Sequence, residues 1–291
     1  MDADDDARVY DGGVMRWTVG GVRVTKVVEH EFTVPFKGLL TAAPLDPAER
    51  YPWLVPHFVT ADGSARTSIH GLVVDTGDRR VLVDTCIGHM RETAGTPMPS
   101  DFLQALEAAG YTVEDIDTVV CTHLHFDHVG WNTRLVDGEW TVTFPRARYL
   151  FARSEWEHWQ QTGSDVVDLA DTVRPVVEAG RADLVETDHV LCDEIRLEPT
   201  PGHTPGHVSV RIDSRRERAY ITGDLAHHPV QFAEPELCST ADSDPAGSEA
   251  TRRRFREERR QDGALVIGTH FPGPTAGRIV ATDGKWEFAT G

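Results

Sequence analysis

The sequence predicts a mixed α/β protein, and three observations indicate this class. The predicted elements follow the order strands, helices, strands, helix, strand, which is typical of a mixed fold. Short apolar runs, such as DTVVC at 117–121 and ALVIGTH at 264–270, are typical of buried strands. Side chains that bind metals follow several of these runs directly, and in layered α/β proteins ligands usually bind at the ends of strands.

The length of 291 residues fits one or two domains, and a hydrophobic content of 40% is enough for a core. The candidate metal ligands extend from His123 to His270, so most of the chain must lie in one compact unit. We therefore expect a single domain over residues 15–291. The polar residues 1–14 are expected to form a flexible N-terminus.

Strands and hairpins are predicted where apolar runs or alternating residues meet Gly and Asp turn residues, and helices where apolar residues recur three or four apart. A cap-like Ser or Asp and a following glycine bound the first helix. The predicted elements, in order, are a hairpin at 15–28, strands at 69–75 and 80–84, a helix at 100–109, a strand at 117–121, a hairpin about Asp137–Gly138, a strand at 148–152, helices at 154–161 and at 165–180 (interrupted by Pro175), strands at 208–212 and 220–224, a helix at 247–261, a strand at 264–270 and a hairpin about Asp283–Gly284.

Residues 32–68 have no clear periodicity. Five prolines interrupt an apolar segment that contains Phe36, Trp53 and Phe58. A long apolar loop of this kind forms a substrate pocket or packs against a partner subunit, which leaves a homodimer open. The simpler alternative is that the segment covers the core.

The nonapeptide THLHFDHVG at 122–130 contains four side chains of metal-binding types within six residues. His123 and His125 point to the same side in extended backbone, and Asp127 and His128 follow after a turn. Neutral imidazole and carboxylate suit a borderline cation such as zinc. The alternative, a solvated polar loop, does not account for this density of ligand types.

Further candidate ligands follow downstream, each beside a predicted strand. His203 and His207 lie in the turn-rich PGHTPGH segment, Asp224 ends a strand in TGD, and His270 ends another in GTH. The ordered set HLHFDH, PGHTPGH, TGD and GTH resembles the metallo-β-lactamase fold superfamily from about Trp17 onwards. The resemblance implies an αββα four-layer sandwich of two mixed β-sheets.

The resemblance also implies a role for each ligand. His123, His125 and His203 would hold one metal ion, Asp127, His128 and His270 a second, and Asp224 would bridge the two. Asp84, at the end of VLVDT, would support a ligating histidine by a hydrogen bond. Two divalent ions, zinc by expectation, would activate a bridging hydroxide that attacks an ester-like carbonyl. On this basis Asp127, Asp224 and His227 are the candidate catalytic residues.

Within this superfamily the sequence favours a lactonase. The main bacterial β-lactamases lack the bridging Asp, glyoxalase II carries its metal loop nearer the N-terminus, and the net charge of −18 disfavours RNase Z. The flavodiiron oxidoreductases carry Glu inside the metal loop and an added flavin domain, and neither is seen here. The segment GDLAHHPVQF at 223–232 is similar to methyl parathion hydrolase-like enzymes and N-acyl homoserine lactonases. His227 stands where the best-known lactonases have a Tyr that orients the carbonyl, and His can donate the same hydrogen bond. The alternatives are an organophosphate triester hydrolase and a non-catalytic ligand sensor.

We expect a small, neutral, partly apolar substrate held by aromatic side chains, since the metals supply the polar groups of the site. The substrate-binding candidates are Phe36, Trp53, Phe58, Trp131 and His227, whereas His207 and His228 are interpreted as structural.

Charge and composition exclude several partners. With 29 Lys and Arg against 47 Asp and Glu, the surface repels nucleic acid and anionic lipid. The basic run RRRFREERR at 252–260 alternates with Glu, which predicts a solvated helix face. No apolar stretch approaches the length of a membrane span, and the N-terminus lacks an apolar signal region. Four unpaired cysteines indicate a reducing compartment, so we expect a cytoplasmic protein.

Overall fold

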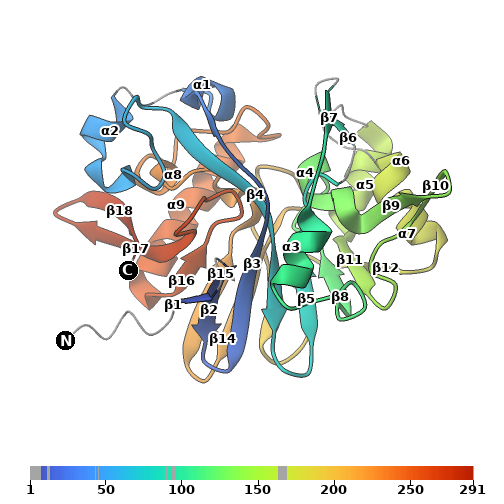
Figure 1. Cartoon of the computed structure of the whole chain (residues 1–291). Helices are drawn as coiled ribbons and strands as arrows, with labels where there is room; N and C mark the ends of the chain where they lie inside the picture. The colour runs from blue at the N-terminus through green and yellow to red at the C-terminus, as the bar shows by residue number, and fades with distance from the viewer. Residues whose placement is uncertain are drawn as a thin grey trace. The chain divides into compact units, whose positions relative to one another are not determined.

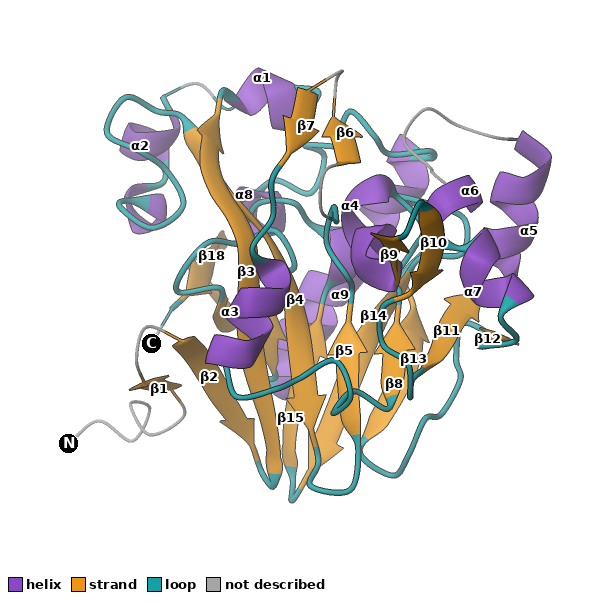
Figure 2. Cartoon of the chain, turned by 45° about the vertical axis from the view of Figure 1, so that its right-hand side comes forward, coloured by secondary structure: helices purple, strands orange, loops and turns teal. Residues whose placement is uncertain are grey.

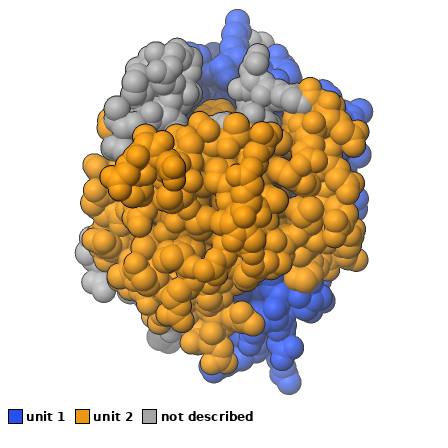
Figure 3. Space-filling model, turned by 90° about the vertical axis from the view of Figure 1, so that its right-hand side faces the viewer, with its two compact units in different colours: residues 1–5, 31–68, 190–291 blue, residues 6–30, 69–189 orange. Residues whose placement is uncertain are grey.

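The computed structural model describes residues 8–11, 14–42, 44, 46–88, 91–93, 96–162 and 169–290. These residues form two compact units, coloured separately in Figure 3. Among the described residues, unit 1 comprises those within 31–68 and 190–290, and unit 2 comprises those within 8–30 and 69–189. The single domain over 15–291 stays a prediction.

Among the described residues, eight strands form a mixed sheet that belongs mostly to unit 2. Its order is β1-β2-β3-β4-β5-β8-β11-β12, with parallel pairing from β5 through β12. Strand pairs with apolar runs on both faces, such as β8 and β11, are the ones that pair in parallel. The strands are β1 (Arg8–Asp11), β2 (Val14–Val19), β3 (Val22–Val34), β4 (Ala65–Asp75), β5 (Arg80–Val83), β8 (Thr118–Val120), β11 (Arg148–Ala152) and β12 (Ala182–Val185).

Helices cover this sheet in unit 2. Helix α3 lies across one face (Figure 2) and buries Phe102 and Leu106 in the core of the unit. The core also contains Trp156 and Trp159 of α5. The remaining elements are α3 (Phe102–Ala108), α4 (Phe126–Val129), η3 (Gly130–Asn132), α5 (Arg153–Thr162), α6 (Leu169–Thr172), α7 (Arg174–Glu178), and two hairpins, β6 (Arg91–Thr93) with β7 (Thr96–Met98) and β9 (Thr133–Val136) with β10 (Glu139–Val142).

In the described part of unit 1, six strands form a second mixed sheet in the order β13 to β18. Strands β17 and β18, red in Figure 1, form its C-terminal hairpin. Only β15 and β16 pair in parallel, because α9 connects them. Asp244 caps α9 by accepting from the Gly247 N–H, and Gly263 ends it at φ +64°. The elements are α1 (Phe36–Leu39), α2 (Pro47–Arg50), η2 (Pro52–Leu54), β13 (Ile195–Pro199), β14 (Val208–Ser214), β15 (Glu217–Ile221), η4 (Gly223–Leu225), α8 (Val230–Ala233), α9 (Pro245–Asp262), β16 (Leu265–Ile267), β17 (Ala276–Thr282) and β18 (Lys285–Ala289).

Most predicted elements are confirmed, and the differences involve proline and the N-terminus. Residues 32–68 contain the end of β3, three short helical segments and the start of β4, because Pro35, Pro47 and Pro52 start helical turns here. The helix predicted at 165–180 contains α6 and α7, with Pro175 in the first turn of α7, and residues 163–168 lie outside those described. In the terminus predicted to be flexible, Arg8–Asp11 pairs with β2; residues 1–7 are not among those described.

Candidate metal centre

In unit 2 the loop after β8 carries the predicted histidines. The side chains of His123, His125 and His128 are almost fully buried, and Asp127 is partly exposed. The ring of His123 lies 4.5 Å from that of His125 and 4.1 Å from that of His128, centroid to centroid. Asp127 Oδ1 lies 3.6 Å from His128 Nε2. Strand β8 therefore ends in a compact group of four donor side chains.

Asp84 supports this loop as the resemblance implies. Its buried carboxylate accepts hydrogen bonds from the Thr122 N–H at 2.8 Å, from Thr122 Oγ1 at 3.0 Å and from His128 Nδ1 at 3.0 Å. A carboxylate can only accept, so Nδ1 of His128 carries the proton and Nε2 keeps its lone pair. The backbone of Asp84 has φ +60°, an uncommon conformation that Asp tolerates better than most residues.

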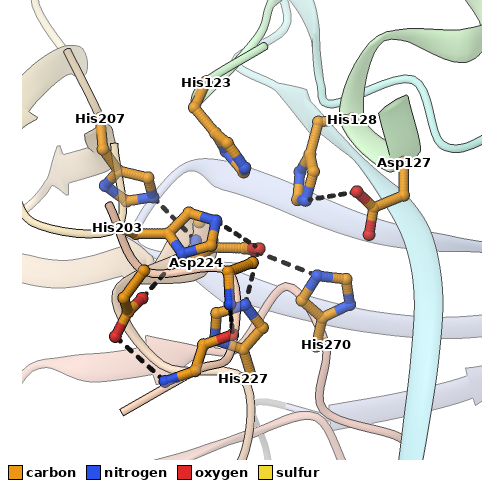
Figure 4. Close-up of polar contacts among 12 residues, drawn as sticks. His123, Asp127, His128, His203, His207, Asp224, His227 and His270 are labelled. Carbon is orange, nitrogen blue, oxygen red and sulfur yellow. Dashed lines mark hydrogen bonds and ion pairs between the residues drawn. The ribbon is translucent and has the colours of Figure 1, made fainter. Parts of the chain in front are cut away.

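In unit 1 three histidines surround the carboxylate of Asp224 (Figure 4). The Nε2 atoms of His203, His227 and His270 lie 3.3, 3.0 and 3.1 Å from its oxygens. Asp224 is buried in the turn η4, directly after β15. The ligand atoms of Asp224, His227 and His270 lie within 4.8 Å of one another, which is close enough to hold one ion. An imidazole and carboxylate set of this kind fits a divalent transition metal.

Hydrogen bonds to Nδ1 orient two of these rings. His270 Nδ1 lies 3.0 Å from the Ser68 carbonyl oxygen, and His203 Nδ1 lies 2.8 Å from Asp242 Oδ1. Burial opposes ionisation of Asp242, but the hydrogen bond from His203 and nearby positive charges hold its pKa below the ordinary value. Both rings therefore present Nε2 to Asp224.

His207 holds the backbone at Asp224. Its Nε2 accepts the Asp224 N–H at 2.8 Å, and its Nδ1 lies 3.0 Å from the Thr200 carbonyl oxygen. His228 lies in the core, where Nε2 donates to the Phe58 carbonyl oxygen at 2.9 Å and Nδ1 accepts from the Val230 N–H. Burial lowers the pKa of His228 to about 4. Both residues thus have the structural roles that the sequence indicates.

His227 is the candidate substrate-facing residue, and it lies beside Asp224. Its ring is 6% exposed and stacks parallel to that of His270 at 5.4 Å. Its backbone N–H donates to Gln231 Oε1 at 2.7 Å. Burial lowers the pKa of His227, and its Nε2 lies 3.0 Å from Asp224 Oδ2, which can only accept a hydrogen bond.

The aromatic residues predicted to bind substrate have mostly structural surroundings. Phe58 is 0% exposed and packs edge-on against Phe271 and Phe288, each at 6.0 Å. Phe36 is buried against His228. In unit 2, Trp131 is buried and its Nε1 donates to Glu29 and Ser100. The ring of Phe58 fills the core of unit 1, and its role as a substrate contact stays a prediction.

A surface pocket of about 530 Å³ nevertheless involves residues 32–68. Trp53 is half-buried beside Tyr51 and does not line it. The pocket lies in unit 1, and Thr67 donates from its hydroxyl to the His270 carbonyl oxygen. Its lining residues are Glu31, Phe32, Thr33, Pro56, His57, Arg66, Thr67, Pro272 and Gly273.

The burial of two arginines of α9 was not predicted from the sequence. Arg252 of the basic run is 0% exposed and Arg259 is 6% exposed, so the interpretation of this run as a solvated helix face is wrong for both. The signal was present, because Arg252, Phe255 and Arg259 are spaced as i, i+3 and i+7 and so share the buried face of α9.

Comparison with known sequences gives the same superfamily that the sequence motifs resemble. The model of the Metallo-beta-lactamase superfamily matches residues 67–270. An N-acyl homoserine lactonase of a Bacillus species is 28% identical over 166 residues, which span 57% of this chain and 60% of that protein. A probable metallo-hydrolase of Mycobacterium tuberculosis is 29% identical over 184 residues, or 55% of this chain and 57% of that protein. The chain thus spans less than two thirds of the length of these curated relatives.

Two solved structures share the fold over nearly the whole chain. The hydrolase AbOPH of the beta lactamase superfamily has a TM-score of 0.81 at 24% identity and covers 97% of this chain and 98% of its own. AidC, a dizinc quorum-quenching lactonase in complex with a product N-hexanoyl-L-homoserine, has a TM-score of 0.77 at 20% identity and covers 99% of both chains. The predicted fold class is confirmed.

Proposed function

The chain belongs to the metallo-β-lactamase superfamily, whose members include metal-dependent hydrolases, and we propose that it is a lactonase. The observation that carries the proposal is the arrangement around Asp224, where three buried histidines turn Nε2 toward one carboxylate. The named lactonases among the relatives and solved structures support the substrate class.

The proposed centre uses the ligand set that the family resemblance implies. His123, His125 and His203 would hold one divalent ion, Asp127, His128 and His270 the other, and Asp224 would bridge them. The hydrogen bonds at Nδ1 of His128, His203 and His270 favour the tautomer that carries the lone pair on Nε2, and this supports the assignment. Zinc is the expected metal because it takes imidazole and carboxylate ligands.

When bound, the two ions would polarise the substrate carbonyl and lower the pKa of water to give a nucleophile at neutral pH. The protein residues orient the reactants. His227, whose Nε2 lies 3.0 Å from Asp224 Oδ2, would contact a substrate oxygen bound beside it, and the burial of Asp224 and its histidines would keep competing water away.

The proposed substrate is neutral and partly apolar. The net charge of −18 disfavours anions at long range, so a lactone ring with an alkyl substituent fits better than an acidic ester. Phe32, Pro56 and Pro272 offer apolar surface in the pocket of unit 1 for such a substituent.

Metal analysis together with a substrate panel tests the proposal. We expect two ions per chain, loss of turnover after chelation, and higher kcat/KM for alkyl-substituted γ- and δ-lactones than for aryl esters or phosphotriesters. Asp224→Asn keeps the side-chain volume and should lose about 10²-fold or more in kcat while the protein stays folded.

Three results would contradict this proposal. A stoichiometry of one ion at saturating metal would refute the two-ion centre. Faster turnover of phosphotriesters than of every lactone would favour the organophosphate hydrolase instead, and metal binding without turnover of the panel would favour a sensor.

Two further predictions concern the cellular location of the protein and its oligomeric state. The four cysteines are free, which supports a reducing compartment and our proposal of a cytoplasmic location. None of the described helices combines the length and apolar character needed to cross a membrane. A homodimer through residues 32–68 stays a prediction.

A further inference from the structure

Arg252 of α9 is a buried cation surrounded by polar atoms from three chain segments of unit 1. Its Nε donates to the Pro235 carbonyl oxygen at 2.9 Å, and its Nη2 donates to Cys238 Sγ at 3.1 Å. Its Nη1 lies 3.4 Å from both the Leu225 carbonyl oxygen and Asp242 Oδ2. The guanidinium thus connects α9 to the turn that carries Asp224 and to the segment before the helix.

Asp242 lies between this arginine and His203. Its side chain is 0% exposed, and Oδ2 also accepts the Ser239 N–H at 3.0 Å. Oδ1 lies 2.8 Å from His203 Nδ1. Both oxygens of this carboxylate therefore have fixed donors, and its orientation is determined on both sides.

The position of His203 follows from this pair. Because the carboxylate only accepts, Nδ1 carries the ring proton and Nε2 keeps a lone pair, 3.3 Å from Asp224 Oδ2. The Ser243 N–H donates to the His203 carbonyl oxygen at 2.8 Å, so the residue is held at its ring and at its backbone.

Gly202 brings the same loop onto α9. A Cβ at this glycine would lie 2.3 Å from the Ser248 nitrogen, and its φ of +138° is unfavourable for other residues. The Thr251 hydroxyl donates to the Pro201 carbonyl oxygen at 2.8 Å. The loop before His203 is therefore attached to the helix that supplies Arg252.

We propose that Arg252 and Asp242 form a positioning pair that fixes the tautomer and ring orientation of His203 and thereby sets the affinity of the centre for metal. A buried ion pair contributes little net stability compared with well-packed apolar side chains, which favours a positioning role. The inference rests on the proposed function, because it requires His203 to be a metal ligand.

Asp242→Asn tests the pair with little change in volume. Zinc affinity, measured by competition with a chromophoric chelator, should fall about 10- to 100-fold. In the metal-free protein, the ¹⁵N signals of the His203 ring should lose the Nδ1–H pattern of the wild type. The matched control is Asp213→Asn, since Asp213 also binds arginines, Arg211 and Arg218, at the far end of β14. It should leave both readouts unchanged.

A second pair of variants separates positioning from folding. Arg252→Met combined with Asp242→Asn removes both buried charges, and it should bind zinc as weakly as Asp242→Asn alone. Arg253→Met, at the adjacent exposed arginine, should bind like the wild type.

The outcomes distinguish the inference from the proposed function. If the wild type binds two zinc ions and folded Asp242→Asn binds them equally tightly, the positioning role is wrong and the proposed function stands. If the wild type binds no zinc, both are wrong. A lower melting temperature with unchanged zinc affinity would show that the pair acts only on the fold.

Discussion

A single buried histidine makes the stability of the protein depend on pH. Burial lowers the pKa of His228 to about 4, from an unfolded value of 6.5. As pH falls from about 6.5 to about 4, the unfolded chain takes up a proton that the folded chain does not, so the free energy of unfolding decreases. At about 1.4 kcal/mol per pKa unit, His228 should remove up to about 3 kcal/mol over this window and nothing further below it.

Urea unfolding of the metal-free protein between pH 7 and pH 4 checks this, with His228→Gln as the reference. The glutamine can still donate to the Phe58 carbonyl oxygen but does not titrate. Other groups titrate alike in both proteins, so the difference in their free energies of unfolding isolates His228. A difference that is constant with pH would contradict the prediction.

Individual residues of the candidate site differ in whether the sequence alone points to them. Asp84 and His203 belong to motifs whose spacing carries their role, and the structure gives both the hydrogen bonds expected of ligands and their supports. Asp242 and Arg252 have no such motif. Their role depends on α9 packing against a loop about 50 residues earlier, a tertiary contact that local patterns do not contain.

At the scale of elements, the segment 32–68 contains two kinds of aromatic residue that its composition does not distinguish. Phe58 lies in the core, whereas Phe32 is 41% exposed and lines the pocket. Phe58→Ala should therefore cost about 3–5 kcal/mol of stability through the cavity it leaves. Phe32→Ala should change stability by about 0.5 kcal/mol or less.

Steady-state kinetics of the same variants test whether Phe32 contacts the substrate. Phe32→Ala should raise KM for lactones with long alkyl chains more than for short ones, with kcat unchanged, because it removes binding that is uniform along the reaction. Trp53→Ala, outside the pocket lining, is the control. If Phe58→Ala is instead as stable as the wild type and loses the preference for long alkyl chains, Phe58 contacts the substrate as the sequence analysis predicts.

At the scale of the whole molecule, the order of elements is enough to predict a mixed α/β fold, because strand and helix periodicities are local. The two mixed sheets were implied by the resemblance to the superfamily. The sequence does not predict the grouping of residues 31–68 with 190–291. That grouping depends on packing between distant segments, such as Leu40, Phe58 and Phe232 in one core. The candidate metal ligands could be named from the sequence because their motifs lie at predicted strand ends, and their role as ligands stays a prediction.

If the proposed ligands bind zinc, metal binding should stabilise the folded protein. Zinc at 100 times its dissociation constant should add about 2.7 kcal/mol to the free energy of unfolding for each ion bound, and chelation should remove it. His128→Ala in unit 2 and His270→Ala in unit 1 should each lose most of this gain, whereas His189→Ala, outside the proposed ligands, should keep it. Thermal unfolding with zinc and with chelator measures the gain for each protein. If His128→Ala keeps the full gain while His270→Ala loses it, zinc binds to Asp224, His227 and His270 of unit 1 alone, the three donors already close enough to hold it.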